Sequence, residues 1–307
     1  MIASVGESLV DFTPVVSAAG RLDGFRAHPG GSPCNVAVAV ARLGHGAAYA
    51  GRLSGDLFGR LLAGHLADNG VATHLAAQGA EPTALAFVAE RDGEPVYDFR
   101  LDGTAAALLR PSDLPPGRFA GLDAVHFGSL GLLLEPSRGA VLGLAEALRG
   151  RLPLSFDPNV RPDVVADWPG YRAALAEALR LADLVKASEA DLAAWGAPVR
   201  PASGQALVVT AGAAGSRVHV AGRTLACPPV PCRVVDTVGA GDAYMAGLLV
   251  ALAERRALSG AALAALPDEG WLAAMRFASA AAALTCERAG ADPPRRPEVE
   301  ERIAALT

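Results

Sequence analysis

The stretch Asp236-Thr237-Val238-Gly239-Ala240-Gly241-Asp242-Ala243 follows the strand-like residues 232–235 and opens a long Ala/Leu-rich helix predicted over residues 240–257. Small residues at a helix start let successive backbone N–H groups converge on an anion, and the helix macrodipole adds to the attraction. Asp242 would repel a bound phosphate unless its carboxylate takes a proton from an attacking hydroxyl. The alternative is an ordinary acidic residue in a first helical turn, and Gly-Ala-Gly-Asp alone leaves both interpretations open.

A second glycine-rich stretch, Pro29-Gly30-Gly31-Ser32-Pro33-Cys34-Asn35, opens an amphipathic helix predicted over residues 33–43. Paired glycines allow a ligand to approach the backbone closely, and the Asn35 amide offers both a donor and an acceptor. That combination suits a polyhydroxylated ligand, because each sugar hydroxyl both donates and accepts. A glycine turn followed by a capping Asn is the alternative.

Around these two stretches, short apolar runs alternate with helical segments, as in a largely parallel sheet covered by helices. The predicted strands are Ile2–Val10, Ala47–Leu53, Ala124–Phe127, Leu152–Phe156, Asp183–Lys186 and Ala206–Thr210. Further helices are predicted over Asp56–Asn69, Pro136–Leu148, Tyr171–Leu181 and Trp271–Thr285.

Two segments interrupt this alternation. Residues 12–28 lack a helical period, and residues 83–101 read as two alternating strands joined by the turn signal Arg91-Asp92-Gly93-Glu94. Each follows an early strand of the α/β body, so the two segments could pack together as a small β lid. An ordinary edge hairpin is the alternative.

Composition excludes several classes of protein. The 307 residues, 51% of them apolar, suffice for one large α/β domain. A formal net charge of −5 without a basic run argues against nucleic acid or an anionic membrane as partner. No apolar stretch approaches the ~18 residues of a spanning helix, and no positive segment precedes Glu7. We therefore expect a cytoplasmic protein with reduced cysteines.

Taken together, the two glycine-rich stretches resemble the two signatures of the PfkB (ribokinase-like) carbohydrate kinases, and the similarity extends over essentially the whole chain. It implies a three-layer α/β/α fold with a mostly parallel central sheet and a small β lid, and transfer of the γ-phosphoryl group of ATP to a primary hydroxyl. By resemblance, Asp242 is the catalytic base, and Gly239, Ala240 and Gly241 form the anion hole. The catalytic domain would comprise residues 1–11, 29–82 and 105–307, and the lid residues 12–28 and 83–104.

The resemblance also implies a sugar site. Asp11 closes the strand-like Gly6–Asp11, where a carboxylate can accept hydrogen bonds from two adjacent hydroxyls. Asp157-Pro158-Asn159-Val160-Arg161 resembles a motif of fructokinases and 2-keto-3-deoxygluconate kinases, in which Arg161 would steady the transferring phosphoryl group. A turn aspartate and a surface arginine are the alternatives. The implied sugar-binding residues are Asp11, Gly30, Gly31, Asn35, Phe99, Arg100 and Asn159.

A nucleotide and metal site is implied further along the chain. Lys186 would lie near the phosphates and Glu189 would organise magnesium-bound waters, although Ser188 and Asp191 also read as a helix-capping box. The implied ATP-binding residues are Lys186, Glu189, Thr210, Gly212, Gly215, Ser216 and Ser279. The family's potassium loop would comprise Asp236, Val238, Thr285, Arg288 and Gly290, largely through their carbonyls. Pro294 lacks the hydroxyl of its last ligand, which argues against potassium activation.

Substrate preference depends on short segments. Residues 25–31, 55–59 and 102–105 look more like bacterial fructokinases than ribokinases, so D-fructose is the first expectation. 2-Keto-3-deoxygluconate is the alternative, since Arg100 would meet its carboxylate; ribokinase, nucleoside kinase and a non-catalytic sugar-binding relative follow. A dinucleotide-dependent oxidoreductase is disfavoured because its Gly-x-Gly-x-x-Gly fingerprint is missing. The family also implies a homodimer through an apolar lid face.

One compositional feature points to the same positions. The chain holds a single lysine, Lys186, and only three asparagines, which a GC-rich genome explains because its codons favour Arg, Ala and Gly. Lys186 is followed by Ala187, which excludes a Walker P-loop. Lys186, Asn35 and Asn159 nevertheless all fall in candidate ligand-site motifs.

Overall fold

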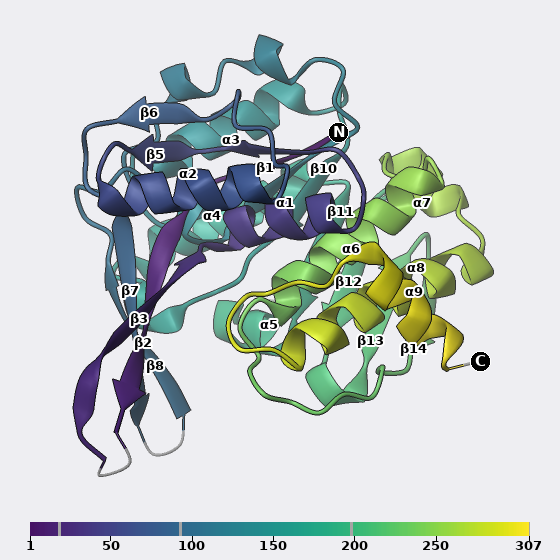
Figure 1. Ribbon diagram of the computed structural model, residues 1–307. Coiled ribbons are helices and arrows are strands. Elements are labelled where there is room, and N and C mark those ends of the chain that lie inside the picture. The colour runs from purple at the N-terminus through teal and green to yellow at the C-terminus, as the bar shows by residue number, and fades with distance from the viewer. Residues whose placement is uncertain (18–19, 92–93, 197–198, 307) are drawn as a thin grey trace.

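The computed structural model describes residues 1–17, 20–91, 94–196 and 199–306, and its core is an eight-stranded sheet (Figure 1). The order is β14-β13-β12-β11-β10-β9-β1-β4; neighbours from β12 to β4 run parallel, and β13 and β14 are antiparallel additions at one edge. The strands are β1 (Ile2–Val5), β4 (Ala47–Ala50), β9 (Ala124–Gly128), β10 (Leu154–Asp157), β11 (Leu184–Ser188), β12 (Ala206–Thr210), β13 (Ser216–Val220) and β14 (Arg223–Cys227).

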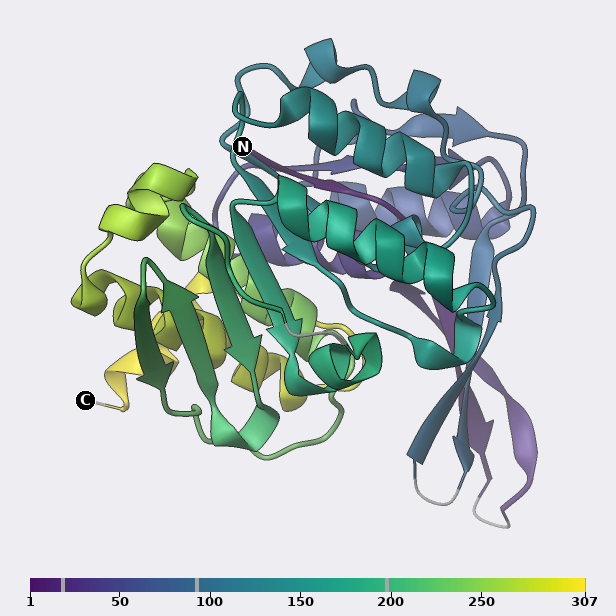
Figure 2. The same ribbon diagram turned by 180° about the vertical axis from the view of Figure 1, so that it is seen from behind.

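Helices cover both faces of this sheet, which confirms the three-layer prediction (Figures 1 and 2). The helices are α1 (Ser32–Arg42), α2 (Leu57–Asp68), α3 (Ser137–Leu148), α4 (Trp168–Leu181), α5 (Glu189–Trp195), α6 (Ala240–Glu254), α7 (Gly260–Ala265), α8 (Asp268–Cys286) and α9 (Arg296–Ala304). Apolar side chains of β12 alternate between the layers: Ala206 and Val208 pack with α1, α6 and α8, whereas Leu207 and Val209 pack with α3, α4 and α5.

The strand predictions for residues 2–10 and 47–53 are wrong, because each run is two strands in different sheets. Gly6 ends β1 with a φ of 143°, and a Cβ there would lie 2.7 Å from Pro33 Cγ. Gly51 ends β4, where a Cβ would lie 2.1 Å from Tyr49 Oη. The chain then enters β2 (Leu9–Val16) after the first break and β5 (Arg52–Ser54), which pairs with β6 (Ala77–Gly79), after the second.

Residues 232–235, expected as a strand, form none. Pro228, Pro229 and Pro231 precede them, and proline has no N–H to donate to a neighbouring strand. The backbone N–H groups of Val235 and Asp236 donate instead to the Cys286 carbonyl at the end of α8. This loop therefore lies against α8 and leads directly into α6.

A separate four-stranded sheet extends from the α/β body (Figure 1). Its order is β3-β2-β7-β8, with β3 (Leu22–Gly30), β7 (Ala84–Arg91) and β8 (Glu94–Arg100). The segments 12–28 and 83–101 thus contribute to one sheet rather than to an edge hairpin of the main one. Residues 92–93 of the predicted turn lie outside the described residues.

Candidate active site

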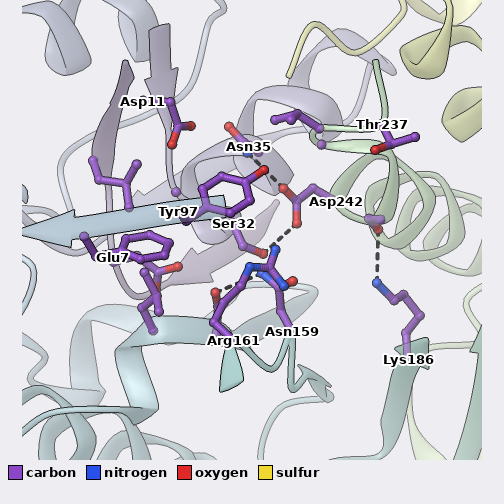
Figure 3. Close-up of a pocket in the computed structure, with 18 residues that line it drawn as sticks. Glu7, Asp11, Ser32, Asn35, Tyr97, Asn159, Arg161, Lys186, Thr237 and Asp242 are labelled. Carbon is purple, nitrogen blue, oxygen red and sulfur yellow. Dashed lines mark hydrogen bonds between the residues drawn. The ribbon is translucent and has the colours of Figure 1, made fainter. Parts of the chain in front are cut away.

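A polar cavity of about 220 Å³ lies where the carboxyl ends of β1, β9 and β10 meet the N-termini of α1 and α6 (Figure 3). Ligands of open α/β sheets bind at this edge. The charged residues that line the cavity are Glu7, Asp11, Arg161, Lys186 and Asp242. The sequence motifs at residues 29–35, 157–161 and 236–242 therefore meet at one place.

Asp242 lies at the junction of the two helices and is held in a fixed orientation (Figure 3). Ser32 Oγ donates to its Oδ1 at 2.6 Å and Asn35 Nδ2 donates to its Oδ2 at 2.9 Å, so α1 orients a carboxylate of α6. Burial raises the pKa of Asp242 above its ordinary value, opposed by these two hydrogen bonds and by the charges of Lys186 and Arg161. A carboxylate with a raised pKa is a better proton acceptor near neutral pH.

The paired glycines before α1 allow three chain segments to approach one another. Gly31 has a φ of 95° and lines the cavity, and a Cβ there would lie 2.8 Å from the Glu7 carbonyl oxygen. A Cβ on Gly30 would lie 2.1 Å from Asp11 Oδ2. Gly30 is absent from the cavity wall, so its contribution is to make room for the Asp11 carboxylate.

Asp11 extends from β2 into the cavity on the side of the small sheet (Figure 3). Burial, and then the negative charge of Asp242, raise its pKa to about 7, while Arg161 opposes the shift. At neutral pH this carboxyl is therefore close to its midpoint, and it can accept hydrogen bonds from ligand hydroxyls when ionised.

Lys186 lies beneath the start of α6. Its Nζ donates to Asp157 Oδ2 at 2.6 Å and to the Gly241 carbonyl at 3.4 Å. Burial alone would lower the pKa of Lys186, but the carboxylates of Asp157 and Asp191 outweigh it and raise the pKa above its ordinary value. The lysine is therefore a permanent positive charge below the predicted anion hole.

The anion hole differs in one respect from the prediction. The Ala240 N–H donates to the Thr237 carbonyl at 3.2 Å, so it is engaged within the turn. The N–H groups of Gly241 and Asp242 have no acceptor among the residues that the structure describes. Gly239, with a φ of 76°, provides the left-handed turn that exposes them.

A second cavity, about 520 Å³ in volume, lies beside the first between β12 and α8. Thr210, Gly212, Gly215 and Ser279, four of the residues that the resemblance implies for ATP, line this cavity together. Ser216 is not on its wall and accepts a 2.8 Å hydrogen bond from the hydroxyl of Tyr244, which is on the wall. The lining that sequence reasoning missed is mostly apolar and comes from the proline-rich loop and from α8: Val230, Pro231, Val234, Ala282, Ala283 and Cys286.

The small sheet closes the polar cavity with aromatic rings. Tyr97 and Phe99 of β8 stack at 5.7 Å between ring centroids and both line the cavity, whereas Arg100 does not. Arg100 is exposed and pairs with Asp98. Strand side chains alternate between faces, so Phe99 and Arg100 cannot point the same way, and this period could have identified Tyr97 instead.

The side chains of the residues predicted at the metal sites make contacts within the protein. Glu189 is exposed and pairs with Arg217. The Asp236 carboxylate accepts from the N–H groups of Val238 at 3.0 Å and Gly290 at 2.8 Å, so it joins the loops on either side of the predicted potassium site.

The side chains of Thr285 and Arg288, from the same predicted potassium site, also have partners within the protein. The Thr285 hydroxyl donates to the Ala281 carbonyl, and Arg288 pairs with Glu298. In the described part of the chain, no three His, Cys, Asp or Glu side chains gather as a metal site.

Comparison with known proteins identifies the family. The pattern of the pfkB family carbohydrate kinases matches residues 1–298. The chain is 37% identical to fructokinase-1 of Oryza sativa subsp. japonica over 98% of its own length and 96% of the relative's, and 38% identical to a fructokinase of Klebsiella pneumoniae over 81% and 83%. The chain belongs to the pfkB family of carbohydrate kinases.

Solved structures of similar carbohydrate kinases agree. A fructokinase of Xylella fastidiosa with bound ATP superposes with a TM-score of 0.87 at 30% identity, covering 99% of this chain and 98% of that one. A fructokinase of Vibrio cholerae with fructose, ADP and calcium superposes with a TM-score of 0.81 at 26% identity, covering 100% and 98%.

In this carbohydrate kinase, Thr237 and Gly241 line both cavities. The two cavities therefore share a wall at the predicted anion hole.

Among the described helices, none is long and apolar enough to cross a bilayer.

Proposed function

We propose that this carbohydrate kinase transfers the γ-phosphoryl group of ATP to the 6-hydroxyl of D-fructose. The observation that carries the proposal is the shared wall: a nucleotide in the apolar cavity and a sugar in the polar one would meet at Gly241, beside Asp242. The larger cavity suits a nucleoside and the smaller one a hexose. The fructokinases with bound ATP, and with fructose and ADP, support both assignments.

Positioning and charge stabilisation supply the chemistry, because phosphoryl transfer requires little covalent participation from the protein. Asp11, Asn35 and the Gly31 backbone hold the sugar hydroxyls, while Tyr97 and Phe99 cover the sugar and exclude water. Asp242 accepts the hydroxyl proton as the oxygen attacks phosphorus. The N–H groups of Gly241 and Asp242, with Arg161 and Lys186 nearby, stabilise the negative charge on the phosphoryl oxygens.

Magnesium fits this scheme as an ion that arrives with ATP. It keeps several waters and is held chiefly by phosphates, so it needs few protein ligands. Glu189, at the N-terminus of α5, contacts Arg217 through Oε1 only, so its other oxygen could accept hydrogen bonds from those waters. When bound, magnesium would neutralise charge on the phosphates.

Potassium would bind chiefly to backbone carbonyls of this loop, as the family resemblance implies. The Gly290 carbonyl itself accepts the Asp292 N–H at 2.9 Å. We propose weak potassium dependence, tested by comparing initial rates in potassium and tetramethylammonium salts.

Charge favours fructose over a sugar acid. The polar cavity has three carboxyl groups, Glu7, Asp11 and Asp242, against two cations, Arg161 and Lys186, and Lys186 is already paired with Asp157. As these carboxyls ionise with rising pH, they would increasingly repel the carboxylate of 2-keto-3-deoxygluconate. Arg100, the cation expected to bind that acid, lies on the opposite face of β8. Arg161, which lies on the described cavity wall, is then the cation that would offset this repulsion.

An ADP-release assay over fructose, 2-keto-3-deoxygluconate, ribose, tagatose and adenosine tests the substrate. We expect turnover with fructose at a kcat/KM at least tenfold above that of the others. Turnover with the keto acid but not with fructose would contradict the proposal. The Asp242→Asn variant serves as the background control.

Apolar side chains are exposed on the small sheet. Val15, Val16, Leu22 and Phe25 expose between 41% and 55% of their area on β2 and β3. We propose that a second copy covers them in the cytoplasm, where ATP is available. Light scattering should give twice the mass of one chain, and Phe25→Ser should reduce it to that of a monomer.

A further inference from the structure

The loop of residues 158–161, which carries Arg161 into the polar cavity, has few backbone hydrogen bonds of its own. Pro158 has no N–H, and among the described residues only the Val160 N–H of this loop has an acceptor. That acceptor is Asp191 Oδ1, at 2.7 Å. One carboxylate of α5 therefore holds the backbone of the loop beside Arg161.

Asp191 joins two segments of the chain. Its Oδ2 accepts the Ser188 N–H at 2.8 Å and the Ser188 hydroxyl at 2.6 Å, which confirms the capping box read from the sequence at the start of α5. Its Oδ1 accepts the Val160 N–H. The two oxygens of one carboxylate thus connect the N-terminus of α5 to the loop that follows β10.

Capping alone does not account for this arrangement. Asp113 and Glu298 belong to the other two capping boxes of the described chain, and outside the box each pairs with an arginine side chain. Asp191 is only 6% exposed, and its contact outside the box is a backbone N–H of another element. A helix cap does not require a buried charge, so the contact with Val160 points to a second role.

The backbone of Val160 connects Asp191 to Arg161. While the Val160 N–H donates to Asp191, the Val160 carbonyl accepts from Arg161 Nη1 at 3.3 Å. Both backbone polar groups of Val160 therefore have side-chain partners, one from α5 and the other from the arginine itself. A rotation of this backbone that broke the first contact would also redirect the guanidinium.

The residue before Val160 makes such a rotation favourable once the contact is lost. Asn159 has a φ of 40°, a conformation that residues other than glycine seldom adopt and that persists where the surroundings hold it. Its Nδ2 donates to Ser129 Oγ at 3.0 Å, so the loop is held from the β9 side at Asn159 and from the α5 side at Val160. Without Asp191, the second of these restraints is missing.

We propose that Asp191 is a positioning residue for phosphoryl transfer: by holding the Val160 N–H, it fixes the direction in which Arg161 enters the polar cavity. This inference rests on the proposed function, in which Arg161 stabilises the transferring phosphoryl group. Asp191 should then act on the chemical step more than on nucleotide binding, because neither Asp191 nor residues 158–161 belong to the described wall of the apolar cavity.

A double-mutant cycle with Arg161 tests the proposal. Asp191→Ala should lower kcat with fructose by about 10- to 100-fold, the range that hydrogen bonds to charged groups imply, with the KM for ATP changed less than about threefold. In the Arg161→Ala background, the same substitution should lower kcat by less than about twofold, because the arginine that Asp191 positions is absent.

Two kinetic results would overturn the proposal. The first is an unchanged kcat in Asp191→Ala. The second is an equal loss of kcat with and without Arg161, which would mean that Asp191 acts through α5 or through its charge near Lys186.

Asp183→Ala is the matched control. Asp183 also accepts a backbone N–H of a neighbouring segment, that of Leu154 at 2.8 Å, but at the opposite end of β10. It should lower the melting temperature and leave kcat within about twofold of wild type. If Asp191→Ala does not fold, Asp191→Glu keeps the charge and the Ser-x-x-Glu form of the capping box, while its extra methylene displaces the carboxylate from Val160. It should show the same loss of kcat and the same dependence on Arg161.

Hydrogen exchange distinguishes a failure of this proposal from a failure of the proposed function. The Val160 amide should exchange at least about tenfold faster in Asp191→Ala and at the wild-type rate in Asp183→Ala. Unchanged exchange in Asp191→Ala would show that Asp191 does not hold the loop, and would overturn the positioning role. A wild-type enzyme that phosphorylates none of the sugars overturns the proposed function, and with it the role of Arg161, whatever the exchange shows.

Discussion

The two cavities of this kinase share a wall but are built by opposite means. The polar cavity depends on side chains that hold one another: Ser32 and Asn35 orient Asp242, and Lys186 is paired with Asp157. The apolar cavity depends on shape, because the proline-rich loop and the small residues of α8, such as Ala282 and Ala283, leave a slot between them. Removing a functional group should therefore damage the first cavity, and only filling space should damage the second.

The difference follows from what each cavity must bind. The base of the proposed nucleotide presents flat, largely apolar faces, which contact and exclusion of water recognise. A sugar and a phosphoryl group present hydroxyls and charge, which need fixed donors and acceptors with little reorganisation. In the polar cavity, the cost of burial is visible in the raised pKa values of Glu7 and Asp11, each about 7.

Asp242→Asn should have the largest effect on turnover. General base catalysis contributes about 10²–10⁴-fold, so kcat should fall by roughly 10³-fold while the dissociation constant for ATP changes little. Steady-state kinetics and calorimetric titration with ATP measure the two quantities.

Asp268→Asn is its control, since Asp268 is also an acidic residue in the first turn of a helix but pairs with Arg223 at the surface. Near-normal turnover in Asp242→Asn would show that the polar cavity does not depend on this carboxylate.

Lys186→Met should have the largest effect on stability. Removing one partner of a buried ion pair costs about 3–5 kcal/mol, because the Asp157 carboxylate would remain buried and unpaired. Urea unfolding measures the loss. Adding Asp157→Leu should recover most of the stability but not the activity, since the positive charge below the anion hole is still missing.

Arg180→Met is the exposed control: it removes the contacts with Glu146 and Glu177 at the surface and should leave the free energy of unfolding nearly unchanged. Full activity in the stable double variant would show that Lys186 is structural only.

Filling the apolar cavity should weaken ATP binding and leave sugar binding unchanged. Ala283 of α8 is buried and lines that cavity, so Ala283→Phe should raise the KM for ATP by about 10- to 100-fold, the range that overpacking of 1–3 kcal/mol implies. At saturating ATP, kcat and the KM for the sugar should stay within about threefold of wild type. Ala273→Phe, on the exposed side of the same helix, is the control. An equal rise in the sugar KM would argue that the two cavities are not independent.

The polar cavity was more predictable from the sequence than the apolar one, for the same physical reason. Charged and amide residues such as Asp11, Asn35, Asn159 and Lys186 stand out in a chain depleted of Lys and Asn, and the structure places all four on the polar cavity wall. Ala282 and Ala283 cannot be distinguished by sequence from the many other alanines, because they contribute only by being small enough to leave space for the cavity.

The errors of sequence reasoning came from single residues with long-range contacts. A Cβ at Gly6 would meet Pro33, and one at Gly51 would meet the Gly6 carbonyl oxygen at 2.3 Å as well as the nearby Tyr49 hydroxyl. Pro33 and Gly6 belong to distant segments, which no local pattern reveals. Ser32 lies inside a stretch that the sequence singled out, yet its role depends on Asp242, 210 residues further along the chain. Arg100 could have been corrected by strand alternation alone.

The smallest expected effect concerns the free energy of unfolding, which is lowered by burying the Asp11 carboxylate in the polar cavity. The pKa of Asp11 is about 7 in the folded protein and 3.8 ordinarily, chiefly because of burial. Its ionised form is therefore penalised in the folded state: the penalty is absent below pH 4, grows as pH rises and is complete above pH 7.

Asp11→Asn removes the penalty, so the variant's free energy of unfolding should exceed that of wild type by at least about 1 kcal/mol at pH 8 and by nothing measurable at pH 4, in the absence of ligand. Urea unfolding at the two pH values, with the exposed Asp163→Asn as control, measures the difference. The same variant should bind fructose poorly, because an amide accepts fewer hydroxyl hydrogen bonds than a carboxylate. A variant less stable than wild type at pH 8 would mean that Asp11 stabilises the fold, and that the cavity's charges carry no such cost.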